Sequence, residues 1–182
     1  DFRRAELSFY DADLAAAEQQ LDSLLARVTD HELANDALDL LLACEALSAD
    51  SASVAPYVEA ALALRQGRGG AARSALAQLQ GRASPLVQQL ALQTRARSLH
   101  EQGDTQAARR LYEELIQLAP EGPFRAESQL ALASIQEQDG RARRALKELQ
   151  EALLAVPRDA RAPALRLRIQ RLRQQLAAAP EA

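Results

Sequence analysis

Aromatic residues are scarce in this chain. Only 3% of its 182 residues are Phe, Trp or Tyr, and Trp and Met are absent. The apolar share is nevertheless 48%, so alanine and leucine must build the core. This composition favours many short helices that lie close together. The missing initiator Met predicts that the chain is processed or cut from a longer protein.

Cysteine is almost absent as well. Cys44 is the only one, which excludes an internal disulfide and leaves the compartment open. The sequence LLAC at 41–44 resembles a lipoprotein cleavage site, but Asp36 and Asp39 interrupt the apolar segment that such a signal needs. We therefore expect Cys44 to be a small buried residue on a helix. No apolar run reaches 18 residues, so direct membrane insertion is not expected.

Positive charge is not in excess. The net charge is −3, which argues against a nucleic-acid binder, since that class carries a basic footprint. The distribution is uneven: residues 1–60 hold 13 acidic and 3 basic side chains, whereas residues 61–182 hold 12 acidic and 19 basic ones. This asymmetry indicates either an ordinary solvated surface or a face that steers a charged partner.

The motifs of catalysis and cofactor binding are also missing. The two histidines, His31 and His100, have no Cys, His or carboxylate pair at metal-ligand spacing. No nucleophile elbow, phosphate loop or dinucleotide fingerprint occurs, and the glycine-rich stretch at 67–70 lacks the following Lys. Glu113 and Glu114 are adjacent on a predicted helix and so diverge by about 100°. We expect no metal, no cofactor and no catalytic activity.

What the chain does contain is an internal repeat. The stretch 103–120 recurs as 140–157, a period of 37 residues, and a weaker copy begins at Gly67. In each strong copy a glycine is followed by alanine after five residues and by proline after seventeen. These positions are Gly103, Ala108 and Pro120 in the first copy and Gly140, Ala145 and Pro157 in the second. Periods of 20 to 50 residues indicate a stacked array.

The spacing within each copy predicts a helical hairpin. Glycine supplies the tight turn between two antiparallel helices, and the proline ends the second helix because it cannot continue one. The alanine between them lets the paired helices approach closely. We therefore expect Ala108 and Ala145 to be buried where the two helices of a hairpin meet.

The pattern resembles the tetratricopeptide repeat. Its small, aromatic-or-leucine and proline signature is matched by Ala96, Ala108, Tyr112 and Pro120, and again by Ala133, Ala145, Leu149, Ala152 and Pro157. It departs from the family at Arg95, Gln129 and Gln136. The resemblance implies an all-α, right-handed α-solenoid of about ten antiparallel helices that binds another protein or a peptide without catalysis. The loop after Pro120 lengthens the usual unit of about 34 residues in a style similar to bacterial cell-envelope proteins, which favours a bacterial periplasm or cell envelope.

The helical periodicity divides one predicted domain, 1–182, into units. In the first of these units, we expect Phe2, Leu7 and Phe9 to cover the helix that follows them and to leave an apolar edge on the outer side of the hairpin. The division is a truncated hairpin at 1–28, an irregular extra helix and linker at 30–53, repeats at 54–85, 86–120 and 123–157, and a capping helix at 160–178.

The resemblance also implies a binding groove, because in the repeat family the first helix of each hairpin lines a concave surface. It places there Tyr57, Arg65, Gln93, Arg97, His100, Glu101, Glu127, Leu130, Ser134 and Glu137. Ala61 maps there too. The lysines and asparagines that clamp a C-terminal carboxylate are missing, so an extended or helical segment is expected. We predict Tyr57 and Arg97 as the strongest contacts, since Tyr and Arg are frequent anchors.

A second charged patch crowds the last predicted helix. It consists of Arg158, Arg161, Arg166, Arg168, Arg171 and Arg173. The patch is interpreted as a solvated cap, as a docking site for an acidic partner, or as a membrane or nucleic-acid contact. For the chain as a whole the alternatives to partner binding are a structural or oligomerising segment, whose repeat ends pair, and a regulatory domain fused to an enzyme.

Overall fold

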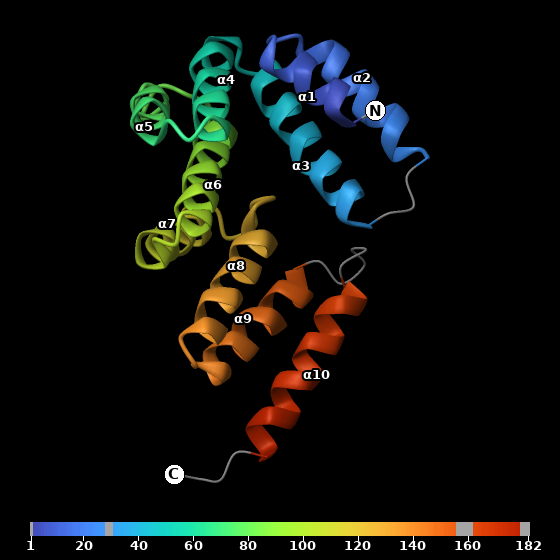
Figure 1. Cartoon of the computed structure of the whole chain (residues 1–182), viewed down its shortest axis with the longest axis vertical. Coiled ribbons are helices and arrows are strands. Elements are labelled where there is room, and N and C mark those ends of the chain that lie inside the picture. Colours follow the sequence, from blue (N-terminus) through green and yellow to red (C-terminus); the bar gives the residue numbers. More distant parts are fainter. Residues whose placement is uncertain (1, 28–30, 156–161, 179–182) are drawn as a thin grey trace. The chain divides into compact units, whose positions relative to one another are not determined.

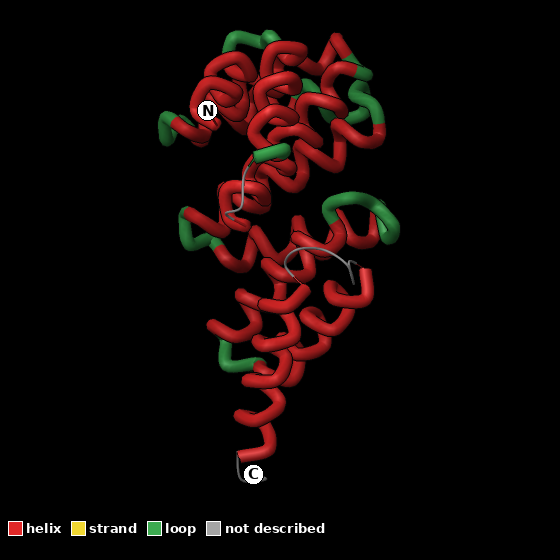
Figure 2. Tube along the Cα trace, turned by 90° about the vertical axis from the view of Figure 1, so that its right-hand side faces the viewer, coloured by secondary structure: helices red, strands yellow, loops and turns green. Residues whose placement is uncertain are grey.

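The computed structural model describes residues 2–27, 31–155 and 162–178. Within these ranges it contains ten helices and no strand, which confirms the all-α class (Figures 1 and 2). The helices are α1 (Phe2–Tyr10), α2 (Leu14–Leu25), α3 (His31–Ser48), α4 (Ser51–Arg65), α5 (Gly69–Ala77), α6 (Pro85–Glu101), α7 (Thr105–Leu118), α8 (Arg125–Gln138), α9 (Ala142–Ala155) and α10 (Ala162–Ala178).

The chain divides into two compact units. The first is Asp1–Thr94 and the second is Arg95–Ala182, so the boundary falls inside α6. The sequence had predicted one domain over 1–182. The two units are described separately below.

Repeated turn chemistry joins the hairpins of the second unit. Gly103 and Gly140 have φ of 84° and 73°, in the left-handed region that glycine adopts without steric cost. After each glycine the chain closes back on the preceding helix: the amide of Asp104 donates to the carbonyl of Leu99 at 2.9 Å, and 37 residues later that of Arg141 donates to Gln136 at 2.7 Å. The period of 37 therefore corresponds to a repeated helix–turn–helix geometry.

The core of the second unit lies between successive helices. Two hydrophobic clusters are formed, one by Ala96, Ala108, Tyr112, Leu132 and Ile135, the other by Ala133, Ala145, Leu149, Leu165, Ile169 and Leu172. Helix α8 packs on α9, and α9 packs on α10 (Figure 1). Ala108 and Ala145 are completely buried, as predicted from their place in the hairpin.

In the first unit, α1 pairs with α2, α3 packs on α2, and α4 pairs with α5. Asp13 caps α2, since its carboxylate accepts from the amide of Ala16 at 3.1 Å. Of the three residues expected to cover the next helix, Phe9 is buried and Phe2 is half-buried, but Leu7 is 64% exposed. Only part of the predicted α1 contact is therefore formed.

The connection between α3 and α4 is shorter than predicted. The polar stretch 48–53 was expected to be a linker before a helix starting near residue 55. Helix α4 instead begins at Ser51 and contains Pro56, at the cost of one backbone hydrogen bond. The carboxylate of Asp50 accepts from the amide of Ser84 at 2.6 Å, just before α6. This hydrogen bond lowers the pKa of Asp50 and fixes the turn to a residue 34 positions away.

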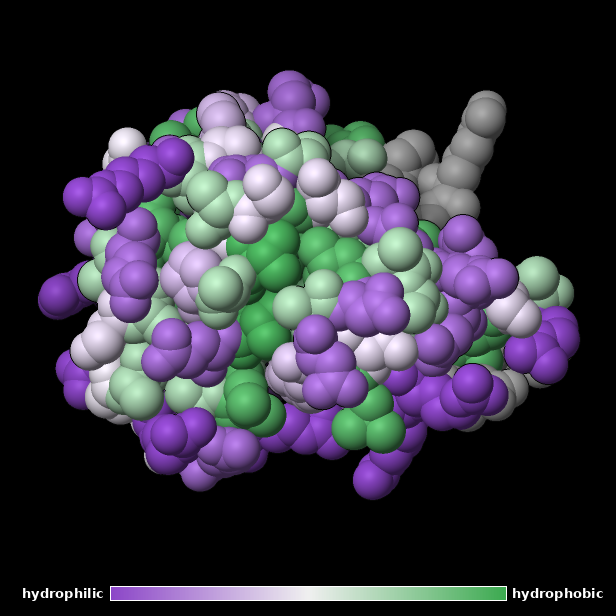
Figure 3. Space-filling view, turned by 90° about the horizontal axis from the view of Figure 1, so that it is seen from above, coloured by the Kyte–Doolittle hydropathy of each residue, from purple (hydrophilic) through white to green (hydrophobic). Residues whose placement is uncertain are grey.

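Few large hydrophobic side chains are exposed in the part of the chain that the structure describes. On the face drawn in Figure 3, hydrophobic residues gather in a short central strip that hydrophilic residues surround. None of the helices in the described ranges combines the length and the apolarity needed to cross a membrane.

Candidate functional site

One face of α8 carries four of the residues that the resemblance placed in a groove. Glu127, Leu130, Ser134 and Glu137 are spaced by three or four residues and so lie on one side of the helix. All four are partly exposed, and Leu130 also contacts the hydrophobic cluster between α8, α9 and α10. The predicted stripe on α8 is thus continuous and accessible.

Two ion pairs bracket this stripe. Arg97 of α6 donates to Glu127 at 2.7 Å, and Arg168 of α10 donates to Glu137 at 2.8 Å. The pair of Arg168 with Glu137 is partly buried, with side chains 35% and 31% accessible. The Arg97 side chain is 47% accessible, so its pair with Glu127 is largely exposed. Exposed pairs of this kind contribute about 0–1 kcal/mol to stability. Their partners can therefore be exchanged for those of a ligand at little cost.

We use the name "α8 face" for Arg97, Glu127, Leu130, Ser134, Glu137 and Arg168. Five of these six residues were predicted from the sequence. Arg168 was predicted only as part of the terminal arginine patch, because its pairing with Glu137 depends on how α10 packs beside α8.

Two other predicted groove residues are buried. Tyr57 is 5% exposed; its ring lies edge-on to Phe9 with the centroids 6.3 Å apart, and its hydroxyl is 2.7 Å from Thr94 Oγ1. Gln93 is 4% exposed. Because both side chains are enclosed by neighbouring helices, neither offers a surface to a partner in this structure. The expectation that Tyr57 is one of the strongest partner contacts is not supported by its position.

Arg65 is held within the first unit. Its guanidinium is paired with Glu6 and lies 5.5 Å from the centre of the Tyr10 ring. The Tyr10 hydroxyl and the Glu6 carboxylate raise the pKa of Arg65. This side chain links the end of α4 to α1.

The two remaining predicted residues lie at the end of α6. The His100 ring is half-buried and edge-on to Tyr112, with the centroids 6.4 Å apart, whereas Glu101 is exposed. Burial raises the pKa of Tyr112 to about 12, so its hydroxyl stays protonated at neutral pH. His100 thus packs against Tyr112 with one part of its ring, and the rest of the ring is accessible to solvent.

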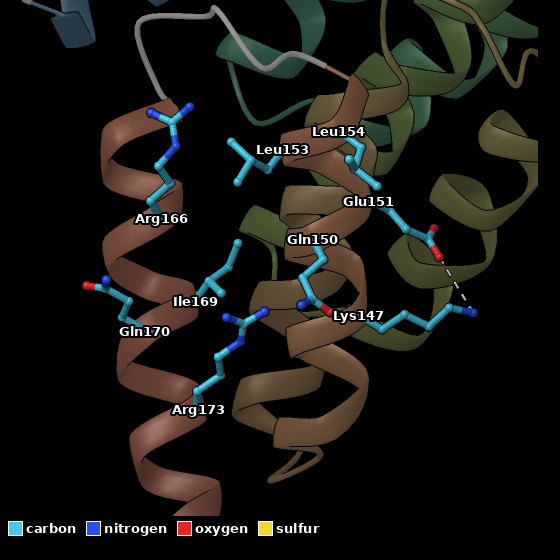
Figure 4. Close-up of a pocket in the computed structure, with 9 residues that line it drawn as sticks. All are labelled: Lys147, Gln150, Glu151, Leu153, Leu154, Arg166, Ile169, Gln170 and Arg173. Atoms are coloured by element: carbon cyan, nitrogen blue, oxygen red, sulfur yellow. Dashed lines mark ion pairs between the residues drawn. The ribbon is translucent and has the colours of Figure 1, made fainter.

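A separate groove lies between α9 and α10, with a volume of about 650 Å³ (Figure 4). Ile169 and Arg173 point from α10 towards α9, and Leu153 points from α9 towards α10. The groove is lined by Lys147, Gln150, Glu151, Leu153, Leu154, Arg166, Ile169, Gln170 and Arg173. We call it the "α9–α10 groove".

The sequence had indicated only half of this groove. Arg166 and Arg173 were recognised as part of a basic patch, while Arg158 and Arg161 of the same patch lie outside the described residues. Leu154, which is 79% exposed, was missed. A signal was present: Leu153 and Leu154 are adjacent, so both cannot face the core on a single-sided helix.

Cys44 is a buried free cysteine on α3. Burial raises the pKa of the Cys44 thiol to about 12, which keeps it protonated and inert at neutral pH. No group of three or more His, Cys, Asp or Glu side chains that could hold a metal ion occurs in the described ranges.

Glu148 on α9 has a raised pKa. Burial is the main cause, and the nearby carboxylates of Glu151 and Glu113 add to it. A carboxyl whose pKa is raised by folding stabilises the fold fully below its ordinary pKa of 4.5, and this contribution is lost as pH rises through the folded pKa. The ionised Glu148 thus destabilises α9 at neutral pH.

We therefore expect Glu148→Gln to stabilise the protein by about 0.2–0.5 kcal/mol at pH 7, the scale of a like-charge pair on a helix. The gain should disappear below about pH 4, where the wild-type carboxyl is protonated. Urea unfolding at both pH values measures this. Glu114→Gln, on an exposed residue of α7, is the control. A gain that persists unchanged in acid would contradict the electrostatic cause.

The comparison with known families agrees with the repeated geometry. Residues 99–169, which include α7, α8 and α9, match the family model described as Tetratricopeptide repeat. No curated protein and no solved structure matches the chain. Repeats of this family are typically non-catalytic modules that mediate interactions between proteins. Together with the hairpins of α7 to α9, the match identifies residues 99–169 as tetratricopeptide repeats.

Proposed function

We propose that the chain is a non-catalytic adaptor or scaffold that binds a segment of another protein on the α8 face. The observation that carries the proposal is the stripe of Leu130 and Ser134 between two ion pairs. A bound segment with an apolar side chain over Leu130 and charged side chains on either side would match this arrangement. Nucleic acid and membrane lipid are not the proposed ligands.

The charges of the α8 face favour a ligand of mixed charge. Two arginines and two glutamates alternate across α6, α8 and α10. A ligand carboxylate can replace Glu127 as the partner of Arg97, and a ligand cation can replace Arg97 as the partner of Glu127. Such exchange makes Arg97 the residue that we expect to contribute most, because guanidinium groups bind carboxylates in bidentate geometry.

The first test identifies a partner and then blocks the face. A protein captured from the native source by the wild-type chain would be titrated against Ser134→Arg, which places a long cation in the centre of the stripe. We expect at least about a tenfold loss of affinity, or 1.4 kcal/mol. Gln117→Arg is the matched control, because Gln117 is exposed on α7, away from the stripe.

Arg97→Ala refines the same test and should also weaken binding. Undiminished affinity for both Ser134→Arg and Arg97→Ala, with unchanged helix content, would show that the α8 face is not the binding site. Light scattering on the same samples separates the alternative, a self-associating structural segment: a monomer that binds its partner supports the adaptor.

A further inference from the structure

Helix α10 exposes a face whose counterpart on α8 is buried. The two helices begin 37 residues apart, at Ala162 and Arg125, so positions can be compared by that period. Three residues that are buried on α8 correspond to three exposed residues on α10. The pairs are Gln129 with Arg166, Ala133 with Gln170, and Gln136 with Arg173.

The difference concerns only one side of the helix. On the neighbouring side, about 100° around the helix, Leu165, Ile169 and Leu172 are buried, and so are their counterparts Ser128, Leu132 and Ile135. Helix α10 is thus docked on the preceding helix in the same way as α8. What the described part of α10 lacks is a helix on its other side.

Helix α9 supplies that contact to α8. Ala145, Leu149 and Ala152 are completely buried on α9, and Ala133 of α8 lies in the same cluster as the first two. At the edge, the amide nitrogen of Gln129 donates to Glu151 at 2.9 Å. On this side, α8 therefore contacts an apolar stripe of α9 that has a carboxylate beside it.

Helix α9 packs on one side of α8. The α9–α10 groove lies on the corresponding side of α10. Its floor is apolar, with Leu153 and the buried Ile169, and Arg166 and Arg173 stand on α10. Lys147 and Glu151 are paired at 3.6 Å, and Glu151 also accepts from Gln129. The two arginines make the α10 side of the groove cationic, and no lining carboxylate belongs to α10.

We propose that the α9–α10 groove binds an acidic amphipathic helix of a partner protein, which lies along the side of α10 that corresponds to the α9-facing side of α8. Gln170 stands where α8 has Ala133, so the bound helix lies farther from α10 than α9 lies from α8. The site is separate from the α8 face and does not depend on it. The partner helix carries small and leucine side chains at the spacing of Ala145, Leu149 and Ala152. Its carboxylates face Arg166 and Arg173.

The repeat geometry also fixes the register of the bound helix. Arg166 takes the place of Gln129, so the residue that corresponds to Glu151 is acidic and pairs with Arg166. Gln150 of α9 corresponds, by the period of 37, to Glu113 of α7. The carboxylate of Glu113 contributes to the raised pKa of Glu148 on α9. An acidic residue at the Glu148 position of the partner helix therefore meets a neutral amide and not a like charge.

Two peptides test the charge requirement with one apolar stripe. Both have the α9 sequence, residues 142–155, are hydrocarbon-stapled to remain helical and carry a fluorophore. In the acidic peptide Arg143, Arg144 and Lys147 are each replaced by Glu, whereas the basic peptide keeps them. Fluorescence anisotropy should show that the full chain binds the acidic peptide at least about tenfold more tightly, and that salt weakens this binding.

A third peptide tests the helix stripe itself. It is the acidic peptide with Leu149→Gln, which keeps every charge and removes the central apolar side chain. We expect its affinity to fall by at least about tenfold. Equal binding of this peptide would mean simple attraction between charges, and the proposed docking would be wrong.

Protein variants locate the binding. Arg173→Glu, alone and with Arg166→Glu, should weaken binding of the acidic peptide about tenfold or more. Arg110→Glu on α7 makes the same charge change at an exposed site away from the groove and should leave the affinity unchanged. Helix content and melting of each variant are measured by circular dichroism, and the single Arg173→Glu variant serves if the double variant unfolds.

Three results would overturn the proposal. They are equal affinity for the acidic and basic peptides, equal effects of Arg173→Glu and Arg110→Glu, and no binding up to about 1 mM peptide. Light scattering adds a fourth: a dimer that Arg173→Glu dissociates would assign the groove to a second copy of this chain. Ser134→Arg leaves peptide binding unchanged if the groove and the α8 face are separate sites.

Discussion

Replacing Ala145 by leucine should lower the free energy of unfolding by about 1–3 kcal/mol, the usual cost of overpacking a filled core. Ala145 is completely buried in the cluster with Ala133, Leu149 and Leu165. A leucine at this position needs space that the facing helix occupies, so α8 and α9 must separate or their side chains must leave favourable rotamers.

Ala142→Leu is the matched control for Ala145→Leu. Ala142 lies one turn earlier on α9 and is only half-buried, so its added side chain can extend towards solvent. We expect a cost below about 0.5 kcal/mol. Urea unfolding followed by circular dichroism gives both values, with the midpoint and slope read separately.

The repeat adds a second comparison. Ala108 occupies the same position 37 residues earlier and is also completely buried, so Ala108→Leu should cost about as much as Ala145→Leu. Equal effects of Ala142→Leu and Ala145→Leu would mean that the contact between α8 and α9 does not depend on the small residue. The hairpin register would then have to be reassigned.

The parts of the fold that the sequence predicted best are those with local causes. Helices α7 and α9 lie between the glycine and the proline of the two strong repeat copies, as predicted for the second helix of each hairpin, because glycine, proline and a strong apolar periodicity act within a few residues of each boundary. Helix α4 began earlier than predicted because Asp50 is fixed by Ser84, far away in the sequence. A pattern of neighbouring residues cannot predict a hydrogen bond between residues 34 positions apart.

The same distinction applies to the candidate sites. The residues of the stripe on α8 were named from the resemblance to the repeat family, and they share one side of the helix because they are three or four residues apart. The ion pairs with Arg97 and Arg168 depend on packing between helices and became evident only in the structure. The α9–α10 groove required a comparison of burial at equivalent positions of α8 and α10, which a sequence alone does not provide.

Tyr57 shows why the repeat mapping failed in the first unit. The mapping assumes that each first helix exposes the same face, yet α1 packs against α4 through Phe9 and covers Tyr57. The stretch 2–10 contains no glycine or proline, and its Ala5 stands 12 residues before Ala17, the spacing of Ala133 and Ala145. This spacing places α1 beside α2 and does not report its contact with α4. The burial of Tyr57 thus depends on a contact outside the repeat pattern.

We expect Tyr57→Ala to lower the free energy of unfolding of the first unit by about 3–5 kcal/mol, as for other large buried aromatic side chains. The substitution removes the edge-on contact with Phe9 and leaves Thr94 without the hydroxyl that lies 2.7 Å away. Tyr57→Phe keeps the ring and removes only this hydroxyl, so its cost should be about 0.5–1.5 kcal/mol. The difference between the two variants measures the contribution of the ring.

Chemical denaturation combined with binding distinguishes a core role of Tyr57 from a partner contact. If Tyr57 is a core residue, Tyr57→Phe retains full affinity for a partner and Tyr57→Ala loses affinity only under conditions in which it also loses helix content. If Tyr57 is a partner contact, Tyr57→Ala keeps the wild-type unfolding midpoint and binds more weakly. Because the ring is enclosed by α1 and its hydroxyl is directed to α6, we expect the loss of stability and not the loss of a contact.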